Sequence, residues 1–259
     1  MFFDSHVHLN EKRLLADVEG VIKRAREKGV TRMLVPSYDI VSIENAITLA
    51  HKYEEIFIAL GIHPSDTRLY DLKVLNTLGD YAGNNTKVRA IGEIGLDYYW
   101  AKTDKERAHQ RLFFIEQIKL ADSLHLPVIV HMRDATADTI EILTNHTPKY
   151  GFVMHCFSGS SDSMQVLLKM GAYISFGGPI TFLNAVEPKQ NVASVPLEKL
   201  LIETDAPFLT PHPFRGKINE PGYIPLIAAE IARIRGLSAE KIAQITTANA
   251  CNFFHVENK

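Results

Sequence analysis

Short apolar runs alternate with amphipathic segments along the whole chain, and this alternation restricts the possible folds more than any other feature. Eight runs are nearly continuous in apolar residues, as is typical of parallel strands that are buried on both faces. These runs cover residues 1–7, 32–36, 56–61, 88–94, 127–131, 152–155, 172–176 and 200–204. The segments between them carry apolar residues at helical spacing. The pattern therefore predicts an α/β protein.

Signals for helix ends support this pattern. Thr103 and Glu106 have the spacing of a capping box, in which two side chains bind the orphan N–H groups of a helix start. Gly29 and Gly171 follow segments with helical spacing, at the place where a glycine commonly ends a helix. We therefore expect helices between the strands, and a final helical region over residues 223–235 and 239–254.

Eight strands that alternate with helices over about 250 residues match the usual size of a (β/α)₈ barrel. The same alternation permits a doubly wound open sheet, but the placement of the motifs described below favours the barrel. No linker, low-complexity tract or break in composition divides the chain, so we expect one domain over residues 1–259. In such a barrel the active site lies at the C-terminal ends of the strands. The long loops 181–196 and 207–221 would surround it.

Charge and cysteine usage limit the class of protein. The net charge of −2 and the isoelectric point near 6.6 offer no basic excess for coating nucleic acid, although an enzyme acting on phosphodiesters is still possible. Cys156 and Cys251 form no CxxC pair, which fits a reducing compartment. We expect no secretory signal and no membrane span. The prediction is a soluble, cytoplasmic and monomeric protein.

Histidines and carboxylates recur at the ends of the apolar runs. His6 and His8 are two residues apart, so on a strand both side chains would leave the same face. Taken alone, such a pair is weak evidence, and a single histidine at a strand end is commonly a core residue. In a closed parallel sheet, however, all of these side chains would converge on one end, which predicts a metal site. The candidate ligands are His6, His8, Glu93, His131, His155 and Asp205.

These ligands would suffice for two divalent ions. His6, His8, Glu93 and Asp205 would surround one ion, and Glu93, His131 and His155 the other, so that the carboxylate of Glu93 bridges them. The alternative for Glu93 is a helix cap or a salt bridge. Mixed imidazole and carboxylate ligands admit Mg, Mn, Zn, Co or Ni.

Three carboxylates are predicted to be catalytic: Glu93, Glu203 and Asp205. Asp205 is the expected general base if it touches the attacking water. Glu203 would share a face with Asp205, so one of the two can bind metal while the other supports it. Cys156 is next to His155, but strand alternation would turn it away, so we expect it to be buried packing.

Three further residues are predicted to contact substrate: His63, Tyr98 and Arg215. His63 follows the third strand, and a loop hydrogen bond is an equal alternative. Arg215 lies in a basic loop, where its guanidinium could clamp two phosphate oxygens. For Arg133 a salt bridge is preferred to this role. Tyr98 and its two aromatic neighbours could stack on a base, although packing in the core or a lid explains them equally well.

Six motifs in this order resemble the TatD-type metal-dependent deoxyribonucleases, within the wider amidohydrolase-like barrels. They are DSHVHL at 4–9, GIHP at 61–64, GEIGLDY at 92–98, VHMRDA at 130–135, HCFSG at 155–159 and ETDAP at 203–207. The resemblance implies a TIM-like barrel, two divalent ions held by the six ligands named above, and hydrolysis of phosphodiester bonds in DNA by a metal-activated water. The chain departs from the family pattern at none of these ligand positions.

The leading hypothesis is therefore a deoxyribonuclease, of the 3′–5′ exonuclease type, that acts on single strands or strand ends. The alternative is a small-molecule amidohydrolase, lactonase or phosphoesterase that uses the same two-metal site. Related barrels often bridge their metals with a modified lysine on the fourth strand, and Glu93 in that place argues for the nuclease branch. A third reading, a non-catalytic protein with a relict site, is disfavoured by the complete ligand set.

Overall fold

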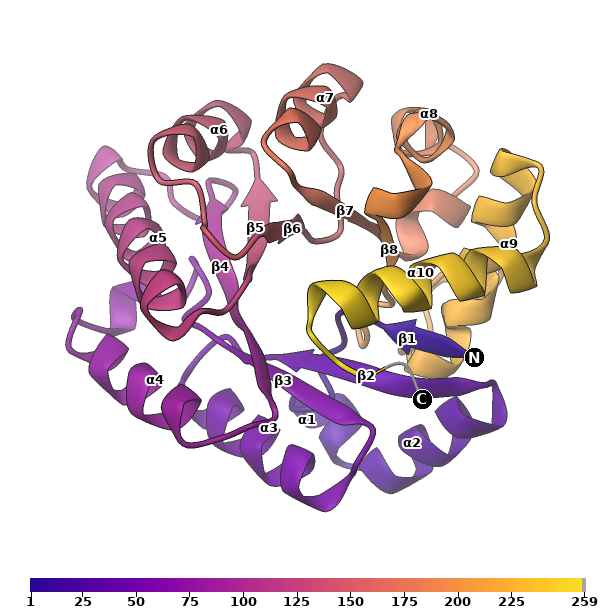
Figure 1. Ribbon diagram of the computed structural model, residues 1–259, viewed down its shortest axis with the longest axis horizontal. Helices are drawn as coiled ribbons and strands as arrows, with labels where there is room; N and C mark the ends of the chain where they lie inside the picture. Colours follow the sequence, from indigo (N-terminus) through magenta and orange to yellow (C-terminus); the bar gives the residue numbers. More distant parts are fainter. Residues whose placement is uncertain (258–259) are drawn as a thin grey trace.

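In the computed structural model, which describes residues 1–257, eight parallel strands form one sheet in the order of the chain (Figure 1). The strands are β1 (Phe2–Asp4), β2 (Val30–Pro36), β3 (Ile56–Leu60), β4 (Val88–Asp97), β5 (Val128–Arg133), β6 (Phe152–Met154), β7 (Tyr173–Phe176) and β8 (Leu200–Ile202). Each strand pairs in parallel with the next. The predicted (β/α)₈ barrel is confirmed.

The two ends of the sheet meet, and this excludes the open-sheet alternative. The Ser5 backbone N–H donates to the carbonyl of Ile202 at 3.1 Å, and the Ser5 hydroxyl donates to the same carbonyl at 2.8 Å. Both bonds lie just beyond β1 and at the end of β8. The last strand is therefore linked to the first, and side chains from β1 and β8 can reach the same point.

Helices form a ring around the strands, as expected from the amphipathic segments (Figure 1). They are α1 (Lys12–Leu15), α2 (Val18–Glu27), α3 (Ile40–Lys52), α4 (Val74–Gly83), α5 (Asp104–Leu124), α6 (Thr136–Asn145), α7 (Ser161–Lys169), α8 (Val186–Ser194), α9 (Ile224–Arg235) and α10 (Ala239–Phe253). Four short 3₁₀ helices add η1 (Thr67–Leu69), η2 (Gly178–Thr181), η3 (Leu197–Lys199) and η4 (Pro221–Tyr223). The Thr103–Glu106 capping box is present at the start of α5. Gly29 and Gly171 have positive φ angles of 80° and 94° after α2 and α7, as predicted.

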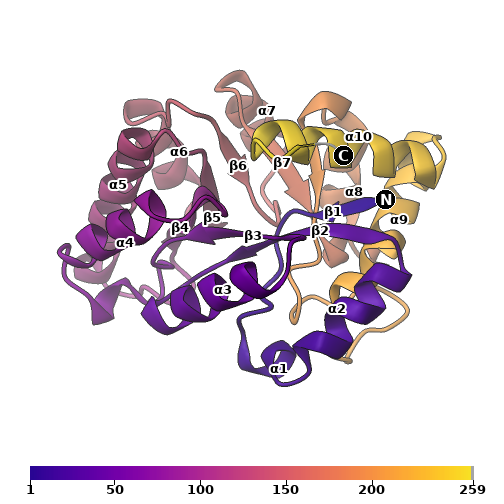
Figure 2. The ribbon, with the colours of Figure 1, turned by 60° about the horizontal axis from the view of Figure 1, so that its bottom comes forward.

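The last helix closes the N-terminal end of the barrel. The end of α10 supplies Cys251 and Phe253, and Phe254 follows directly after the helix. All three side chains pack against inward residues of the strands. In Figure 2, α10 and α1 lie at opposite ends of the barrel. One end of the barrel interior is thus sealed by apolar packing, and the other end is left open for polar groups. The inward residues of this cluster are Phe3, Leu34, Ala59, Ala90, Ile129, Val153 and Leu201.

Several strands are shorter than predicted. The first ends at Asp4, the sixth at Met154 and the eighth at Ile202, so His6, His8, His155 and the acidic residues after β8 follow strands. The prediction that His6 and His8 lie on a strand is therefore wrong. The Asp4 carboxylate accepts from the His6 N–H at 3.4 Å, and the His8 N–H donates to Ala206 O, while Val7 N–H still donates to Leu34 O of β2.

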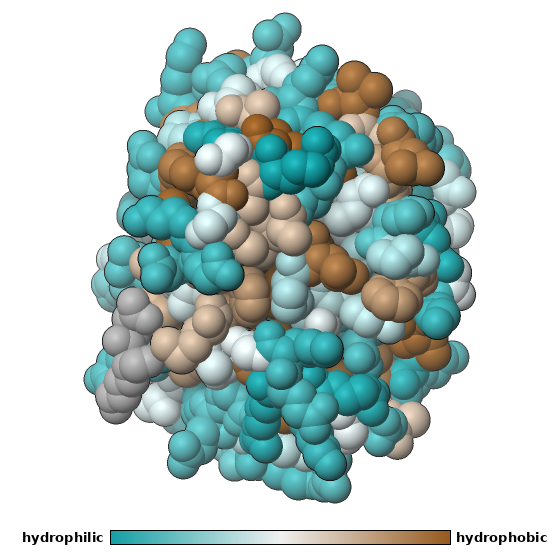
Figure 3. Space-filling view, turned by 90° about the vertical axis from the view of Figure 1, so that its right-hand side faces the viewer, coloured by the Kyte–Doolittle hydropathy of each residue, from teal (hydrophilic) through white to brown (hydrophobic). Residues whose placement is uncertain are grey.

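The surface carries scattered hydrophobic side chains. Figure 3 shows the face on the right-hand side of Figure 1, where small groups of hydrophobic residues are separated by hydrophilic ones. Isolated exposed apolar side chains are ordinary on protein surfaces and identify no site. In residues 1–257, no helix combines the length and the apolar character that crossing a membrane requires.

Candidate metal centre and active site

The six predicted ligands gather at the C-terminal end of the barrel. His6 and His8 follow β1, Glu93 lies in β4 and His131 in β5. His155 and Asp205 follow β6 and β8. Because the C-terminal ends of parallel strands meet at one edge, residues from distant parts of the chain come within contact distance. All six are buried or nearly buried.

A bulge in β4 places Glu93. Ile91 pairs with Val128 and Ile94 with Val130, so three steps along β4 match two along β5. An extra residue of this kind re-aims the side chains around it. The Glu93 N–H donates across to Ser37 O at 3.1 Å, and its carboxylate is turned into the barrel mouth, where it is 3% exposed.

Gly95 makes this arrangement possible. Its φ is 141°, a region that side chains disfavour, and a Cβ atom there would collide with the backbone carbonyl of His131. A glycine beside a candidate ligand can let a ligand approach the backbone closely. Gly95 instead lets β4 and β5 approach each other, and this brings Glu93 and His131 together.

One group of ligand atoms surrounds the Oε2 atom of Glu93. His6 Nε2 lies 3.3 Å and His8 Nε2 3.6 Å from this oxygen, and the two nitrogens are 3.2 Å apart. Asp205 Oδ1 lies 3.8 Å from His6 Nε2 and 3.5 Å from His8 Nε2. Ligands held about 2.1 Å from a tetrahedral ion lie about 3.4 Å apart. Glu93 Oε2 and the two Nε2 atoms therefore have the spacing of a metal site, and Asp205 lies beside the two histidines.

The other oxygen of Glu93 belongs to a second group. Glu93 Oε1 lies 2.7 Å from His131 Nδ1 and 2.8 Å from His155 Nε2. These two nitrogens are 3.3 Å apart. The two carboxylate oxygens of Glu93 thus face different pairs of histidines, as the sequence predicted for a bridging ligand.

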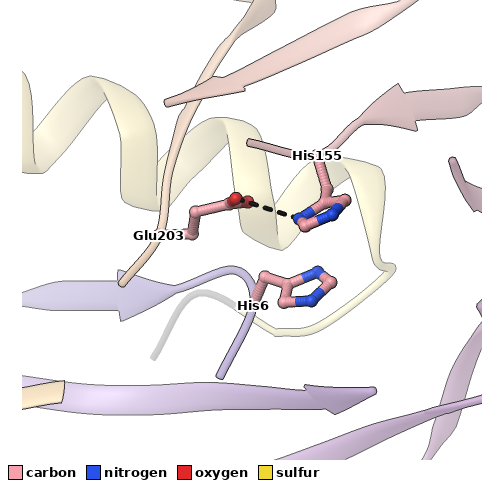
Figure 4. A group of neighbouring side chains, drawn as sticks. All are labelled: His6, His155 and Glu203. Atoms are coloured by element: carbon pink, nitrogen blue, oxygen red, sulfur yellow. Dashed lines mark hydrogen bonds and ion pairs between the residues drawn. The ribbon is translucent and has the colours of Figure 1, made fainter. Parts of the chain in front are cut away.

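Glu203 supports His155 from the side opposite Glu93. Its Oε1 accepts from the Cys156 N–H at 2.7 Å and lies 3.2 Å from His155 Nδ1, and its Oε2 accepts from the Ser175 hydroxyl at 2.5 Å. Figure 4 shows Glu203 pointing toward His155, with the rings of His6 and His155 face to face. The ring centroids are 4.0 Å apart. Glu203 can therefore fix the ring so that its Nε2 faces Glu93.

Asp97 plays the same part for His131 and was missed from the sequence. Its Oδ2 lies 3.1 Å from His131 Nε2, and the residue is 2% exposed. A metal-binding histidine commonly donates its second N–H to such a carboxylate. Glu93 and Asp97 are four residues apart on β4, so alternation along the strand places both side chains on the same face. This spacing could have identified Asp97 as part of the site.

Electrostatics within the cluster favour cations. Burial alone would raise the pKa of Glu93, but the surrounding imidazoles, His155 first, hold that pKa well below its ordinary value. Burial alone would lower the pKa of His155, but the carboxylates of Glu93 and Glu203 raise it well above its ordinary value. Burial likewise opposes ionisation of Asp205, and a hydrogen bond from His8 then lowers its pKa. The carboxylates of Glu93 and Asp205 are therefore ionised when a cation arrives.

The donor set fits divalent metal ions. Imidazole nitrogens suit zinc, nickel and related ions, and carboxylates add affinity for harder ions such as magnesium and manganese. The two predicted groups each contain three residues whose ligand atoms lie within 4.8 Å of one another. The buried Nδ1 atoms of His6 and His8 have no hydrogen-bond partner within residues 1–257, while their Nε2 atoms converge on Glu93. Use of divalent metal is supported, and the number and identity of the ions stay predictions.

Two hollows flank the cluster. Their volumes are about 440 Å³ and about 410 Å³, and His131, His155 and Asp205 line both. The smaller one also contains His8 and Glu93. The larger one has mainly apolar walls, which are formed by Phe157, Phe176, Pro179, Ile180, Phe208 and Leu209. A substrate of moderate size can therefore reach the cluster from two sides.

Of the predicted substrate contacts, His63 lies at the site and Tyr98 does not. His63 lines the smaller hollow, with its Nε2 3.6 Å from Glu93 Oε1 and its Nδ1 2.6 Å from Ser65 Oγ. Tyr98 is 9% exposed and donates its hydroxyl to Asp138, and it is not among the described residues that line either hollow. The structure does not bring Tyr98 to the site, because its side chain points toward α6.

Arg133, and not Arg215, reaches the site. Arg215 is exposed and stacks on Phe182, with its guanidinium carbon 3.8 Å from the ring centroid, away from the described lining of both hollows. Arg133 lines both hollows. Its guanidinium carbon lies 4.0 Å from the ring centroid of Tyr99, so an aromatic contact replaces the expected salt bridge. The preference for Arg215 over Arg133 is not supported by this geometry.

Cys156 is also part of the site's wall. Its φ is 42°, so the chain turns after His155 and Cys156 lines the larger hollow instead of packing into the core. Burial raises the pKa of its thiol well above the ordinary value, and Asp205 adds to this. The thiol is therefore protonated and a poor metal ligand.

Comparison with known proteins gives a consistent family. A family model described as TatD related DNase matches residues 3–255. The uncharacterized metal-dependent hydrolase YabD of Bacillus subtilis is 44% identical over 257 residues, which cover 99% of this chain and 100% of that protein. YcfH of Escherichia coli, also an uncharacterized metal-dependent hydrolase, is 36% identical over 98% of this chain and 96% of its own length.

A solved structure agrees with the sequence relatives. The TatD homologue YjjV of Escherichia coli matches with a TM-score of 0.93 at 32% identity, over 99% of this chain and 98% of that chain. The resemblance noted in the sequence motifs is thereby confirmed. Because the family model and these relatives span almost the whole chain, this protein belongs to the TatD family and is a metal-dependent hydrolase.

Proposed function

We propose that this hydrolase is a deoxyribonuclease that removes nucleotides from the 3′ end of a single DNA strand. The observation that carries the proposal is the position of Glu93, whose two oxygens face two separate ligand groups. Two divalent ions about 3.5–4 Å apart suit the in-line displacement of a phosphodiester, because they stabilise both the attacking and the leaving oxygen. His6, His8, Glu93 and Asp205 would hold one ion, and Glu93, His131 and His155 would hold the other.

The residues of the chain have distinct roles in this proposal. When bound, the ions would lower the pKa of a water and polarise the phosphate. Asp205 lines both hollows with an ionised carboxylate, so it can take the proton that the attacking water loses. Glu93 holds the two ligand groups together, and Glu203 keeps His155 oriented toward it.

Arg133 supplies the positive charge for the substrate. It lines both hollows next to His131, and its planar guanidinium can donate two parallel hydrogen bonds to phosphate oxygens. The ring of Tyr99 beneath it limits its motion. His63 lines the smaller hollow together with Arg133, near Glu93, and its ring can donate a hydrogen bond to a substrate or product oxygen.

The preference for a strand end follows from the shape and charge of the protein. The net charge of −2 provides little attraction for a long duplex, whose binding depends on many phosphate contacts. Hollows of about 440 Å³ and 410 Å³ lie in the range of small-ligand pockets, so they suit one nucleotide. We expect a linear single strand to be shortened faster than a covalently closed circle of the same sequence.

The test uses metal-stripped protein that is resupplied with Mg, Mn or Zn, and single-stranded oligonucleotides labelled at the 5′ or the 3′ end. We expect wild type to shorten the strand from its 3′ end and Glu93→Ala to be inactive. Glu198→Gln, an exposed carboxylate change on η3, is the matched control and should remain active. Cleavage from the 5′ end would overturn the polarity, and equal cutting of the circle would overturn the preference for ends.

A small-molecule hydrolase is the second candidate. The larger hollow has mainly apolar walls, and such walls bind apolar esters well. Turnover of esters, lactones or phosphomonoesters without turnover of any oligonucleotide would establish this alternative in place of the nuclease.

A further inference from the structure

A third hollow continues from the candidate active site along the surface. Its volume is about 980 Å³, which is more than twice that of either hollow at the ligand cluster, at about 440 Å³ and 410 Å³. It lies between the segment after β3 and the start of α5. Ser65, Asp66 and Trp100 line both this hollow and the smaller one around Glu93. A chain-like substrate held at Glu93 can therefore extend into it.

Trp100 stands at the junction of the two hollows with much of its surface in solvent. Its side chain is 61% exposed, and its ring contacts that of Tyr99 edge to face, with the centroids 4.8 Å apart. One large face is thus free for another planar group. An exposed indole in a concave wall is a common platform for a nucleic-acid base.

The backbone of Trp100 is tied to the ligand cluster. Asp97 Oδ1 accepts from the Trp100 N–H at 3.3 Å, while Asp97 Oδ2 lies 3.1 Å from His131 Nε2. One buried carboxylate therefore sets the position of both the aromatic platform and a candidate metal ligand. This fixes the distance between the platform and the site of hydrolysis.

The charged side chains along the groove are two cations and two carboxylates. The two cations that line it are Arg68 and Lys105. Two carboxylates, Asp66 and Glu106, line it as well. The Glu106 carboxylate is engaged by the N–H groups of Lys102 and Thr103 in the cap of α5. Stacking on Trp100 is therefore the main source of affinity, with the two cations in support.

We infer that this groove binds the nucleotides of a single strand that precede the one being removed, with a base stacked on Trp100. The inference rests on the proposed nuclease function and names the part of the substrate that the catalytic hollows do not hold. Base stacking on an aromatic side chain is independent of sequence, because every base has a flat face. The groove should therefore bind single strands of any sequence.

The direct test is the fluorescence of Trp100, which is the only tryptophan of the chain. Glu93→Gln protein, in which we expect turnover to be abolished, is titrated with a ten-nucleotide single strand and with a mononucleotide. We expect saturable quenching by the oligonucleotide and weaker quenching by the mononucleotide, which reaches only the edge of the Trp100 ring that borders the smaller hollow. Tight binding of the oligonucleotide without any change in fluorescence would overturn the inference.

The second test compares kcat/KM for the oligonucleotide and for thymidine 5′-phosphate p-nitrophenyl ester, which is too short to reach the groove. We expect Trp100→Ala to lower kcat/KM for the oligonucleotide about 5- to 100-fold and to lower that for the short ester much less. Trp100→Phe should retain most of the kcat/KM for the oligonucleotide. Lys105→Glu should lower kcat/KM for the oligonucleotide and leave that for the short ester unchanged. Tyr150→Ala, an exposed aromatic change in the segment between α6 and β6, is the control.

The possible failures can be told apart. If wild type acts on the short ester and on no oligonucleotide, the proposed function fails together with the groove. If wild type degrades the oligonucleotide and Trp100→Ala does so equally well, the nuclease function stands and the groove assignment is refuted. An equal loss on both substrates would also refute it, because Trp100 would then act through Asp97 on the ligand cluster.

Discussion

Removing the carboxylate of Glu203 separates its structural role from its electrostatic role. Glu203 is 1% exposed and accepts from the Cys156 N–H, the Ser175 hydroxyl and the side of His155 that faces away from Glu93. In Glu203→Ala the Ser175 hydroxyl can turn to Ser5 Oγ, 3.3 Å away, but the other two donors lose their acceptor. Each buried unsatisfied donor costs about 1–3 kcal/mol, so we expect a loss of about 2–6 kcal/mol in the free energy of unfolding.

Glu203→Gln should behave differently, because the amide has nearly the same shape. Its carbonyl oxygen can still accept from Cys156 and His155, and its NH₂ can donate to Ser175. Most of the stability should remain, while the negative charge behind the His155 ring is lost. Changes to such supporting groups commonly reduce metal affinity about 10- to 100-fold. We therefore expect weaker metal binding in a protein that unfolds almost like wild type.

The assay combines urea unfolding of the metal-free protein with calorimetric titration of Mn²⁺ or Zn²⁺. Glu198→Gln removes an exposed carboxylate and should change neither quantity. The reasoning is refuted if Glu203→Ala unfolds at the wild-type urea concentration, or if Glu203→Gln binds metal as tightly as wild type. Loss of one whole equivalent of metal in Glu203→Gln would instead identify Glu203 as a ligand.

Three further predictions concern the same end of the barrel. Gly95→Ala should destabilise the protein by about 2–6 kcal/mol in urea unfolding, because a positive φ and a collision with His131 O add their costs; wild-type stability would contradict this. Asp97→Asn should weaken metal binding about 10- to 100-fold, measured by calorimetry, since His131 loses its charged partner. Metal affinity should fall as the pH is lowered, because the pKa of His155 is raised and binding must displace its proton. Above that pKa the affinity should level off, and a pH-independent dissociation constant would refute this account.

Much of the fold was predictable because it depends on local patterns. Continuous apolar runs and helical spacing follow from which faces of an element are buried, and capping residues act within one helical turn. This is why the eight strands and signals such as Thr103 and Gly171 were found correctly. The ligand cluster was predictable for a related reason. In a closed parallel sheet all strands end at one edge, so residues at strand ends converge whatever their separation in the chain.

The roles of individual side chains beyond the strands depended on the tertiary structure. Asp205 and Cys156 adopt positive φ angles of 52° and 42°, so alternation no longer predicts where their side chains point. Tyr98 is buried against α6 while Trp100 lines the groove, and the run of three aromatic residues does not distinguish them in the sequence.

The sequence by itself determined that this chain forms a parallel barrel with a cluster of histidines and carboxylates at one end. Only the tertiary structure showed that Asp97 supports His131 and that Arg133, instead of Arg215, lines the hollows. The physical reason is that strand ends are set by burial and hydrogen bonding along the chain. The directions in which loop side chains point are set by contacts between segments that are remote in the sequence.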